Sequence, residues 1–227
     1  MSRPSQTLRN VLPIALAATV AALALSAVAA ADKEKLQFTA SGQADALAAV
    51  LKRADLGTTA TWTGGTKKPD LSNSLAGCSY RPKESDLTMI GAAETDWKTA
   101  GLELDSEANV LETPAMVRLD WQRTIAAPQV LPCLHAALAK AIKPPQRLIS
   151  IRRIAFPQLT QYARAYRVVI DVKTSAGPET EVMLDFLAIG QGQTELSLTT
   201  TAPYAARTAI AAAELRVAEI LISRVRA

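Results

Sequence analysis

Histidine and cysteine are scarce in this chain of 227 residues, which has one histidine, His135, and two cysteines, Cys78 and Cys133. A lone imidazole does not make a zinc site, so we expect His135 to be a structural or surface residue. A Ser-His-Asp triad stays open, because its members need not be close in sequence. No Gly-x-Ser-x-Gly nucleophile motif is present, however. The sequence therefore predicts no metal site, no cofactor and no identifiable catalytic residue.

Acidic residues are absent from the first 31 positions, where Arg3 and Arg9 precede an unbroken apolar run from Val11 to Ala31. Small residues end the run at Ala27-Val28-Ala29, a step that a signal peptidase accepts. We therefore predict a signal peptide over residues 1–31 and an exported domain over residues 32–227, either secreted or held in the cell envelope. An uncleaved N-terminal membrane anchor is the alternative, since about twenty apolar residues can span a bilayer.

Excess charge is small once residues 1–31 are removed, because Arg3 and Arg9 leave with them. The remaining chain then has 23 basic residues against 21 acidic ones. A net charge of this size gives no reason to expect nucleic acid or an anionic membrane as a partner.

Only one disulfide can form, between Cys78 and Cys133. The two cysteines are far apart in the sequence, and no Cys-x-x-Cys redox motif is present. Export would carry both into an oxidising compartment, where pairing is the default. Closing so long a loop would stabilise the fold by about 4 kcal/mol in the chain-entropy model.

Hydrophobic periodicity predicts an α+β fold: one domain with an antiparallel sheet of about six to seven strands, flanking helices and one disulfide. The connections between the last four strands are short, which is typical of a meander, and Gly190-Gln191-Gly192 is predicted to be one of its turns. The predicted helices are residues 44–53, 114–125, 132–142 and 202–225. The predicted strands are residues 58–63, 87–97, 102–111, 148–156, 162–173, 181–189 and 194–201.

Acidic side chains concentrate on one predicted hairpin, and they are Glu94, Asp96, Glu103, Asp105 and Glu107. Period-two spacing places Glu103, Asp105 and Glu107 on one face of their strand, where carboxylates bind hard cations or act as acid and base. A solvated charged face is the favoured interpretation, because no calcium-binding loop frames the group.

Two other residue types are candidates for binding. Trp62, Trp97 and Trp121 fall at core spacing, and Trp97, beside the hairpin tip, is predicted to be the most exposed of the three. Arg152 and Arg153 point to opposite faces of one strand, and an anion-binding role is a minority interpretation. The candidate ligand-binding residues are therefore Trp97, Glu103, Asp105 and Arg152.

Several short motifs together resemble a known family. They are Ala54-Asp55-Leu56-Gly57, Trp62, the first cysteine in a Pro-flanked loop, the hairpin, a helix with Trp121, and Pro132-Cys133-Leu134. This pattern resembles the exported sensor-like domains of actinobacteria, such as the extracellular domain of the mycobacterial Ser/Thr kinase PknH and its stand-alone secreted relatives. The resemblance implies an antiparallel sheet with flanking helices, a disulfide, and binding or sensing in place of catalysis.

Two functions follow as hypotheses. The first is a non-enzymatic exported domain that binds a small ligand or an envelope protein. The second is a secreted hydrolase that uses carboxylates of the acidic hairpin, and it requires two of them to face each other in one pocket.

The disulfide gives the first testable prediction. Mass spectrometry of the exported protein under non-reducing conditions should show a mass two hydrogens below that of the reduced chain, because Cys78 and Cys133 are joined. Alkylation of two free thiols without prior reduction would contradict the pairing.

Overall fold

The computed structural model describes residues 34–71, 84–173 and 179–225, which form an eight-stranded sheet with four helices. The α+β prediction is confirmed. The strands run in the order β1-β3-β4-β8-β7-β6-β5, and β2 also pairs with β3. Their bounds are β1 Lys35–Leu36, β2 Thr63–Lys67, β3 Thr88–Thr99, β4 Leu102–Leu111, β5 Arg147–Ile154, β6 Tyr162–Val172, β7 Thr180–Gln191 and β8 Thr194–Pro203.

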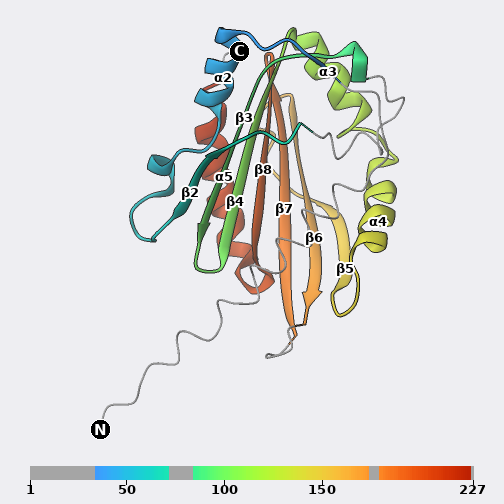
Figure 1. Cartoon of the computed structure of the whole chain (residues 1–227). Helices are drawn as coiled ribbons and strands as arrows, with labels where there is room; N and C mark the ends of the chain where they lie inside the picture. Colours follow the sequence, from blue (N-terminus) through green and yellow to red (C-terminus); the bar gives the residue numbers. More distant parts are fainter. Residues whose placement is uncertain (1–33, 72–83, 174–178, 226–227) are drawn as a thin grey trace.

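The sheet has helices on both faces (Figure 1). Helices α2 (Ala40–Ala49) and α5 (Arg207–Ile222) bury one face with the main apolar cluster, to which they contribute Ala46, Ala49, Val217 and Leu221. Helices α3 (Pro114–Arg123) and α4 (Val130–Ala141) cover part of the other face. The first is called the α2/α5 face below, and the second the α3/α4 face.

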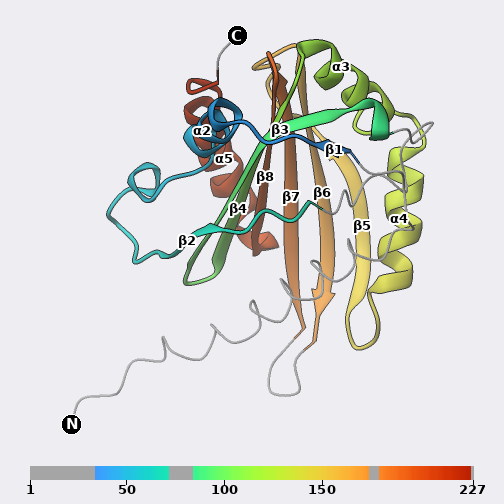
Figure 2. The same cartoon turned by 45° about the horizontal axis from the view of Figure 1, so that its top comes forward.

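Two parts of the sheet differ from the prediction. Strand β1 runs parallel to β3, so the sheet is mixed and not wholly antiparallel (Figure 2). The predicted strand at residues 58–63 is wrong, because β2 begins only at Thr63 and includes Gly64 and Gly65. A Cβ at Gly64 would lie 2.0 Å from the Asp96 carbonyl oxygen, so glycine allows β2 to approach β3.

The hairpin and the meander agree closely with the prediction. Strands β3 and β4 pair from Met89 with Leu111 to Thr99 with Leu102, and Gly101 at the tip has a φ of 81°. Strand β7 runs two residues further than expected at its turn, so Gly190 and Gln191 belong to the strand and the β7–β8 turn is formed by Gly192 and Gln193. The alternation along β4 is also confirmed, since Leu104, Ser106 and Ala108 are buried on the α2/α5 face.

Helix α2 begins four residues before its predicted start. Thr39 is its N-cap and accepts a hydrogen bond of 3.0 Å from the Gly42 backbone amide. A Cβ at Gly42 would lie 2.3 Å from the Ile90 carbonyl oxygen, and one at Gly91 would lie 2.1 Å from the Gly42 carbonyl oxygen. The two glycines therefore allow the backbones of α2 and β3 to touch.

That contact generates the second prediction. Gly42→Ala should lower the free energy of unfolding by about 1–3 kcal/mol, because the added methyl group overlaps the β3 backbone, which cannot move aside freely. Urea denaturation measures the change. Ala44→Ser, at an exposed position of the same helix, is the matched control, and equal stability of the two variants would contradict the prediction.

Candidate functional site

The pairing of β4 with β8 brings together polar side chains that are distant in the sequence. Glu107 lies opposite Ser197, and Asn109 lies opposite Glu195. All four belong to the α3/α4 face of the sheet, because they alternate with the buried residues of the opposite face. These four residues form a polar strip along the centre of this face.

Helix α3 covers the polar strip with Asp120, Trp121 and Thr124. Thr113 caps the helix and Pro114 occupies its first turn, as predicted. The end of the helix is fixed to the sheet at the Ile125 carbonyl oxygen, to which Arg164 Nη1 and Tyr166 Oη each donate a hydrogen bond of 2.7 Å. This anchoring holds Asp120 and Trp121 over β4 and β8.

A pocket of about 160 Å³ lies between α3 and the two strands. Its polar lining is Glu34, Asp70, Glu107, Asn109, Asp120, Thr124, Glu195 and Ser197. Its apolar and aromatic lining includes Leu71, Met89, Trp121, Ile125, Phe186 and Ala188. Trp121 packs against Tyr162 with ring centroids 5.5 Å apart, which holds the indole in place.

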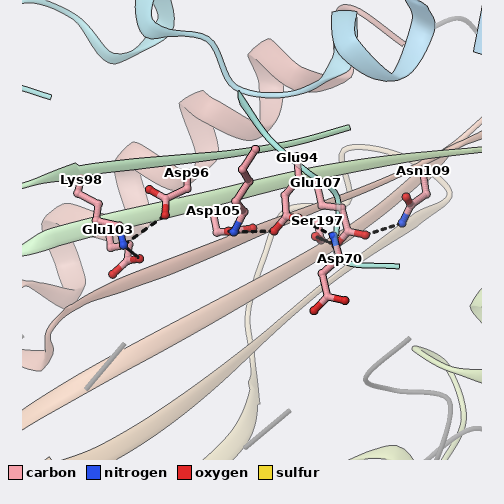
Figure 3. A network of polar contacts seen from close by, with 10 residues as sticks. Asp70, Glu94, Asp96, Lys98, Glu103, Asp105, Glu107, Asn109 and Ser197 are labelled. Atoms are coloured by element: carbon pink, nitrogen blue, oxygen red, sulfur yellow. Dashed lines mark hydrogen bonds and ion pairs between the residues drawn. The ribbon is translucent and has the colours of Figure 1, made fainter. Parts of the chain in front are cut away.

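Most of the acidic hairpin lies outside this pocket and is held by two lysines (Figure 3). Lys67 Nζ lies 2.7 Å from Glu94 Oε1 and 2.6 Å from Asp105 Oδ2. Lys98 Nζ lies 3.2 Å from Asp96 Oδ2 and 2.7 Å from Glu103 Oε1. The expectation of a freely solvated face is wrong at Glu94, whose side chain is only 8% exposed.

These ion pairs perturb the groups that form them. Burial lowers the pKa of Lys67, but hydrogen bonds to Asp105 and Glu94 outweigh burial and raise it above its usual range. Burial raises the pKa of Asp105 to about 6 against the opposing effect of Lys67. Both lysines are therefore already paired with hairpin carboxylates.

Glu107 is the one predicted hairpin carboxylate that lines the pocket. Asn109 Nδ2 donates a hydrogen bond of 2.7 Å to its Oε1 atom, and Ser197 Oγ donates one of 3.4 Å to its Oε2 atom (Figure 3). Burial raises the pKa of Glu107 to about 7 despite these two donors. Glu107 is therefore partly protonated near neutral pH.

Asp120 and Glu195 form a carboxyl pair across the pocket, joined by a hydrogen bond between their side chains. Such a bond requires a proton on one of the two groups. Burial raises both pKa values, and the proximity of Asp120 raises that of Glu195 further. The pair therefore holds a proton at pH values where free carboxyls are ionised.

The other candidate residues from the sequence lie elsewhere. Trp97 is 9% exposed, and its Nε1 atom donates a hydrogen bond of 3.2 Å to the Leu51 carbonyl oxygen, so the prediction that it is exposed is wrong. Arg152 is exposed on β5, away from the pocket. His135 is exposed on α4. Cys133 lies on α4, but Cys78 lies outside the described residues, so the disulfide stays a prediction.

Sequence reasoning missed Asp120, Glu195 and Asn109. Asp120 is a single carboxylate on a helix, and Glu195 and Asn109 are isolated polar residues on two strands. No local spacing distinguishes them from surface residues. Only the β4–β8 register, together with the position of α3, would have grouped them.

A second buried charged group lies on the α2/α5 face, outside the pocket. Arg167 Nε lies 2.6 Å from Asp185 Oδ1, and the Asp185 side chain is 0% exposed. Burial, together with the nearby Asp185, raises the pKa of Glu214, which comes from α5. This group joins α5 to the sheet.

The described residues contain neither a metal-binding cluster nor a membrane-spanning helix. Within residues 34–71, 84–173 and 179–225, no three or more histidine, cysteine or acidic side chains are arranged to hold a metal ion. Over the same ranges, no helix has the length and apolar character needed to cross a membrane.

No protein-family model and no curated protein matches the chain.

The raised pKa values generate the third prediction. A carboxyl whose pKa is higher in the folded state binds more protons there than in the unfolded chain, so its contribution to stability is complete below the unfolded pKa. That contribution is lost as the pH rises through the folded pKa. The free energy of unfolding should therefore fall between pH 4.5 and pH 7, the range between the usual pKa of Glu107 and its folded value.

Glu107→Gln should reduce that fall by roughly 1–3 kcal/mol, as measured by urea denaturation at pH 5 and pH 8. Glu112→Gln, an exposed carboxylate just after β4, is the control and should keep the pH dependence of the unmodified protein. Parallel pH profiles for the unmodified protein and Glu107→Gln would contradict the assignment.

Proposed function

We propose that this chain is an exported, non-enzymatic, sensor-like domain of the cell envelope that binds a small ligand in the pocket between α3 and strands β4 and β8. One observation carries the proposal: Glu107, Asp120 and Glu195 surround a hollow and are not paired with the lysines that neutralise the neighbouring carboxylates. Burying a carboxyl costs free energy. Titratable groups with perturbed pKa values in a hollow are candidates for function.

Export and the disulfide belong to the same proposal. They rest on the apolar run from Val11 to Ala31 and on the two cysteines, and the resemblance to sensor-like domains agrees with both. An envelope protein is the less favoured partner. The carboxyl groups line an indentation that fits a small molecule, whereas protein partners bury much larger surfaces.

The hydrolase alternative has less support. It requires two hairpin carboxylates in one pocket, but Glu107 is alone there, and the other four are bound to Lys67 and Lys98. Asp120 and Glu195 do face each other, but hydrogen-bonded carboxyls are closer than the separation of about 5 Å or more that glycoside hydrolysis uses.

A fragment screen tests the proposed pocket and is the fourth prediction. Fragments of mixed polarity added to the ¹⁵N-labelled protein should shift the backbone amide signals of Ala188 and Ser197, which line the pocket. Ser197→Leu fills the pocket without removing a carboxyl, so it should abolish those shifts.

The matched control is Thr199→Leu, two residues further along the same face of β8 and outside the pocket lining. It should keep the shifts. Fragment binding that is equal in the two variants, or that affects only signals elsewhere, would contradict the pocket as the ligand site.

A further inference from the structure

The polar atoms of the pocket are unevenly divided between donors and acceptors. The Asn109 amide group and the Ser197 hydroxyl both donate to Glu107. Thr124 Oγ1 donates to the Asp120 backbone carbonyl oxygen, at 2.8 Å. The Ser197 and Thr124 hydroxyl hydrogens and one of the two Asn109 amide hydrogens are therefore used within the protein.

Two acceptor atoms stay unsatisfied. Asn109 Oδ1 and Asp120 Oδ1 are buried, and no hydrogen bond to either atom is found in the part of the chain that the structure describes, although the Asp120 carboxyl group as a whole is bonded to Glu195. While Glu107 is ionised, the Asn109 amide is held with its Nδ2 atom facing that carboxylate, because a flipped amide would set two acceptors against each other. A buried acceptor without a donor costs about 1–3 kcal/mol, so the pocket is suited to a ligand that supplies donors.

The nearby cations leave the pocket acidic. Lys67 and Lys98 bind the outer hairpin carboxylates, and Arg123 Nη2 lies 2.9 Å from Asp86 Oδ2. Arg164 donates to the Ile125 carbonyl oxygen, and its guanidinium carbon lies 5.9 Å from the centre of the Trp121 ring. In the part of the chain that the structure describes, Glu107, Asp120 and Glu195 form no ion pair with a lysine, so a cationic ligand would meet these three carboxyl groups directly.

The size and the walls of the pocket restrict the ligand further. The pocket volume of about 160 Å³ is below the roughly 300–1,000 Å³ of pockets that hold drug-sized ligands. Met89, Ile125, Phe186 and Ala188 give it apolar walls beside the polar strip. The space therefore fits a short chain with one polar end.

We propose that the pocket binds a protonated primary amine on a short apolar chain, whose N–H groups donate to Asn109 Oδ1 and Asp120 Oδ1. This inference rests on the proposed function, since it names the class of ligand for the same pocket. A primary ammonium group carries three donors and no acceptor, which complements the unsatisfied atoms. A sugar fits less well, because its hydroxyl groups also need donors from the protein, and most of the donors described above are occupied.

Binding of such a cation should displace protons from the pocket. Asp120 and Glu195 share a proton, and a bound ammonium group favours the ionised form of both. Besides their effects on one another, Glu107, Asp120 and Glu195 are influenced by four other charged groups. These are Glu34, Glu94, Asp105 and Arg123. Three of these four are acidic, which strengthens attraction for a cation as the pH rises. The affinity should therefore be roughly tenfold weaker at pH 5.5 than at pH 7.5.

A matched pair of probes makes the fifth prediction testable. n-Butylammonium chloride and 1-butanol share a four-carbon chain and differ in the charged end. Titrated into the ¹⁵N-labelled protein, n-butylammonium should give saturable shifts of the Asn109 side-chain amide and the Trp121 indole. 1-Butanol should bind about tenfold more weakly or worse, because it offers one donor and no charge.

Two variants locate the binding site. Asn109→Leu keeps the approximate shape of the side chain but removes the acceptor, and Asp120→Asn removes the carboxyl that shares the proton. Each should weaken n-butylammonium binding by about tenfold or more, and Asp120→Asn should also flatten the pH dependence. Glu112→Gln, outside the pocket, should bind as the unmodified protein does. Denaturation curves confirm that each variant is folded.

The possible failures are distinguishable. Equal binding of 1-butanol and n-butylammonium at the pocket would overturn the ammonium inference but keep the pocket as a ligand site. If calcium chloride or glucose produced these shifts and n-butylammonium did not, the ligand would be a metal ion or a sugar and not an ammonium group. An absence of any response to n-butylammonium would overturn it, and the fragment screen would then decide separately whether the pocket binds ligands at all.

Discussion

Backbone pairing between β4 and β8 is the interaction on which the rest of this structure depends. It joins the hairpin of β3 and β4 to the meander of β5 to β8, which would otherwise be two separate sheets. It also continues the α2/α5 core across the junction, since Ala108 lies opposite Leu196. On the other face the same register sets Glu107 beside Ser197 and Asn109 beside Glu195. One long-range contact therefore creates both the main core and the polar strip.

The acidic residues of the β3–β4 hairpin form two groups, those that bind Lys67 or Lys98 and the one that does not. Lys67 comes from β2, and it can bind Glu94 and Asp105 because β2 lies along the outer edge of β3. Lys98 lies on β3 itself and binds Asp96 and Glu103. Glu107, further along β4, has neutral donors instead of a lysine. The carboxylates near the hairpin tip thus stabilise the sheet edge, while the carboxyls beneath α3 stay available for other chemistry.

The sequence predicts the elements whose signals are local. The β3–β4 hairpin, the meander and the capped start of α3 follow from alternation, turn residues and Thr113-Pro114. Strand β1 is two residues long and forms only because β3 offers a free edge, so no pattern precedes it. Strand β2 contains Gly64 and Gly65, which normally end a strand, and here they permit its close approach to β3. Of the candidate site, only Glu107 was recognisable, because Asp120 and Glu195 meet through tertiary contacts alone.

The protonated carboxyls link the stability of the fold to the proposed ligand. Burial without a cation favours the protonated forms of Glu107 and Glu195. Raising the pH towards neutrality therefore lowers the free energy of unfolding. A bound ammonium group would supply the missing positive charge and satisfy Asn109 Oδ1 and Asp120 Oδ1. Its stabilising effect on folding would then grow over the same pH interval in which the empty protein becomes less stable. A domain built in this way would respond to a cationic ligand most strongly near neutral pH, through the same groups that make its empty pocket unfavourable.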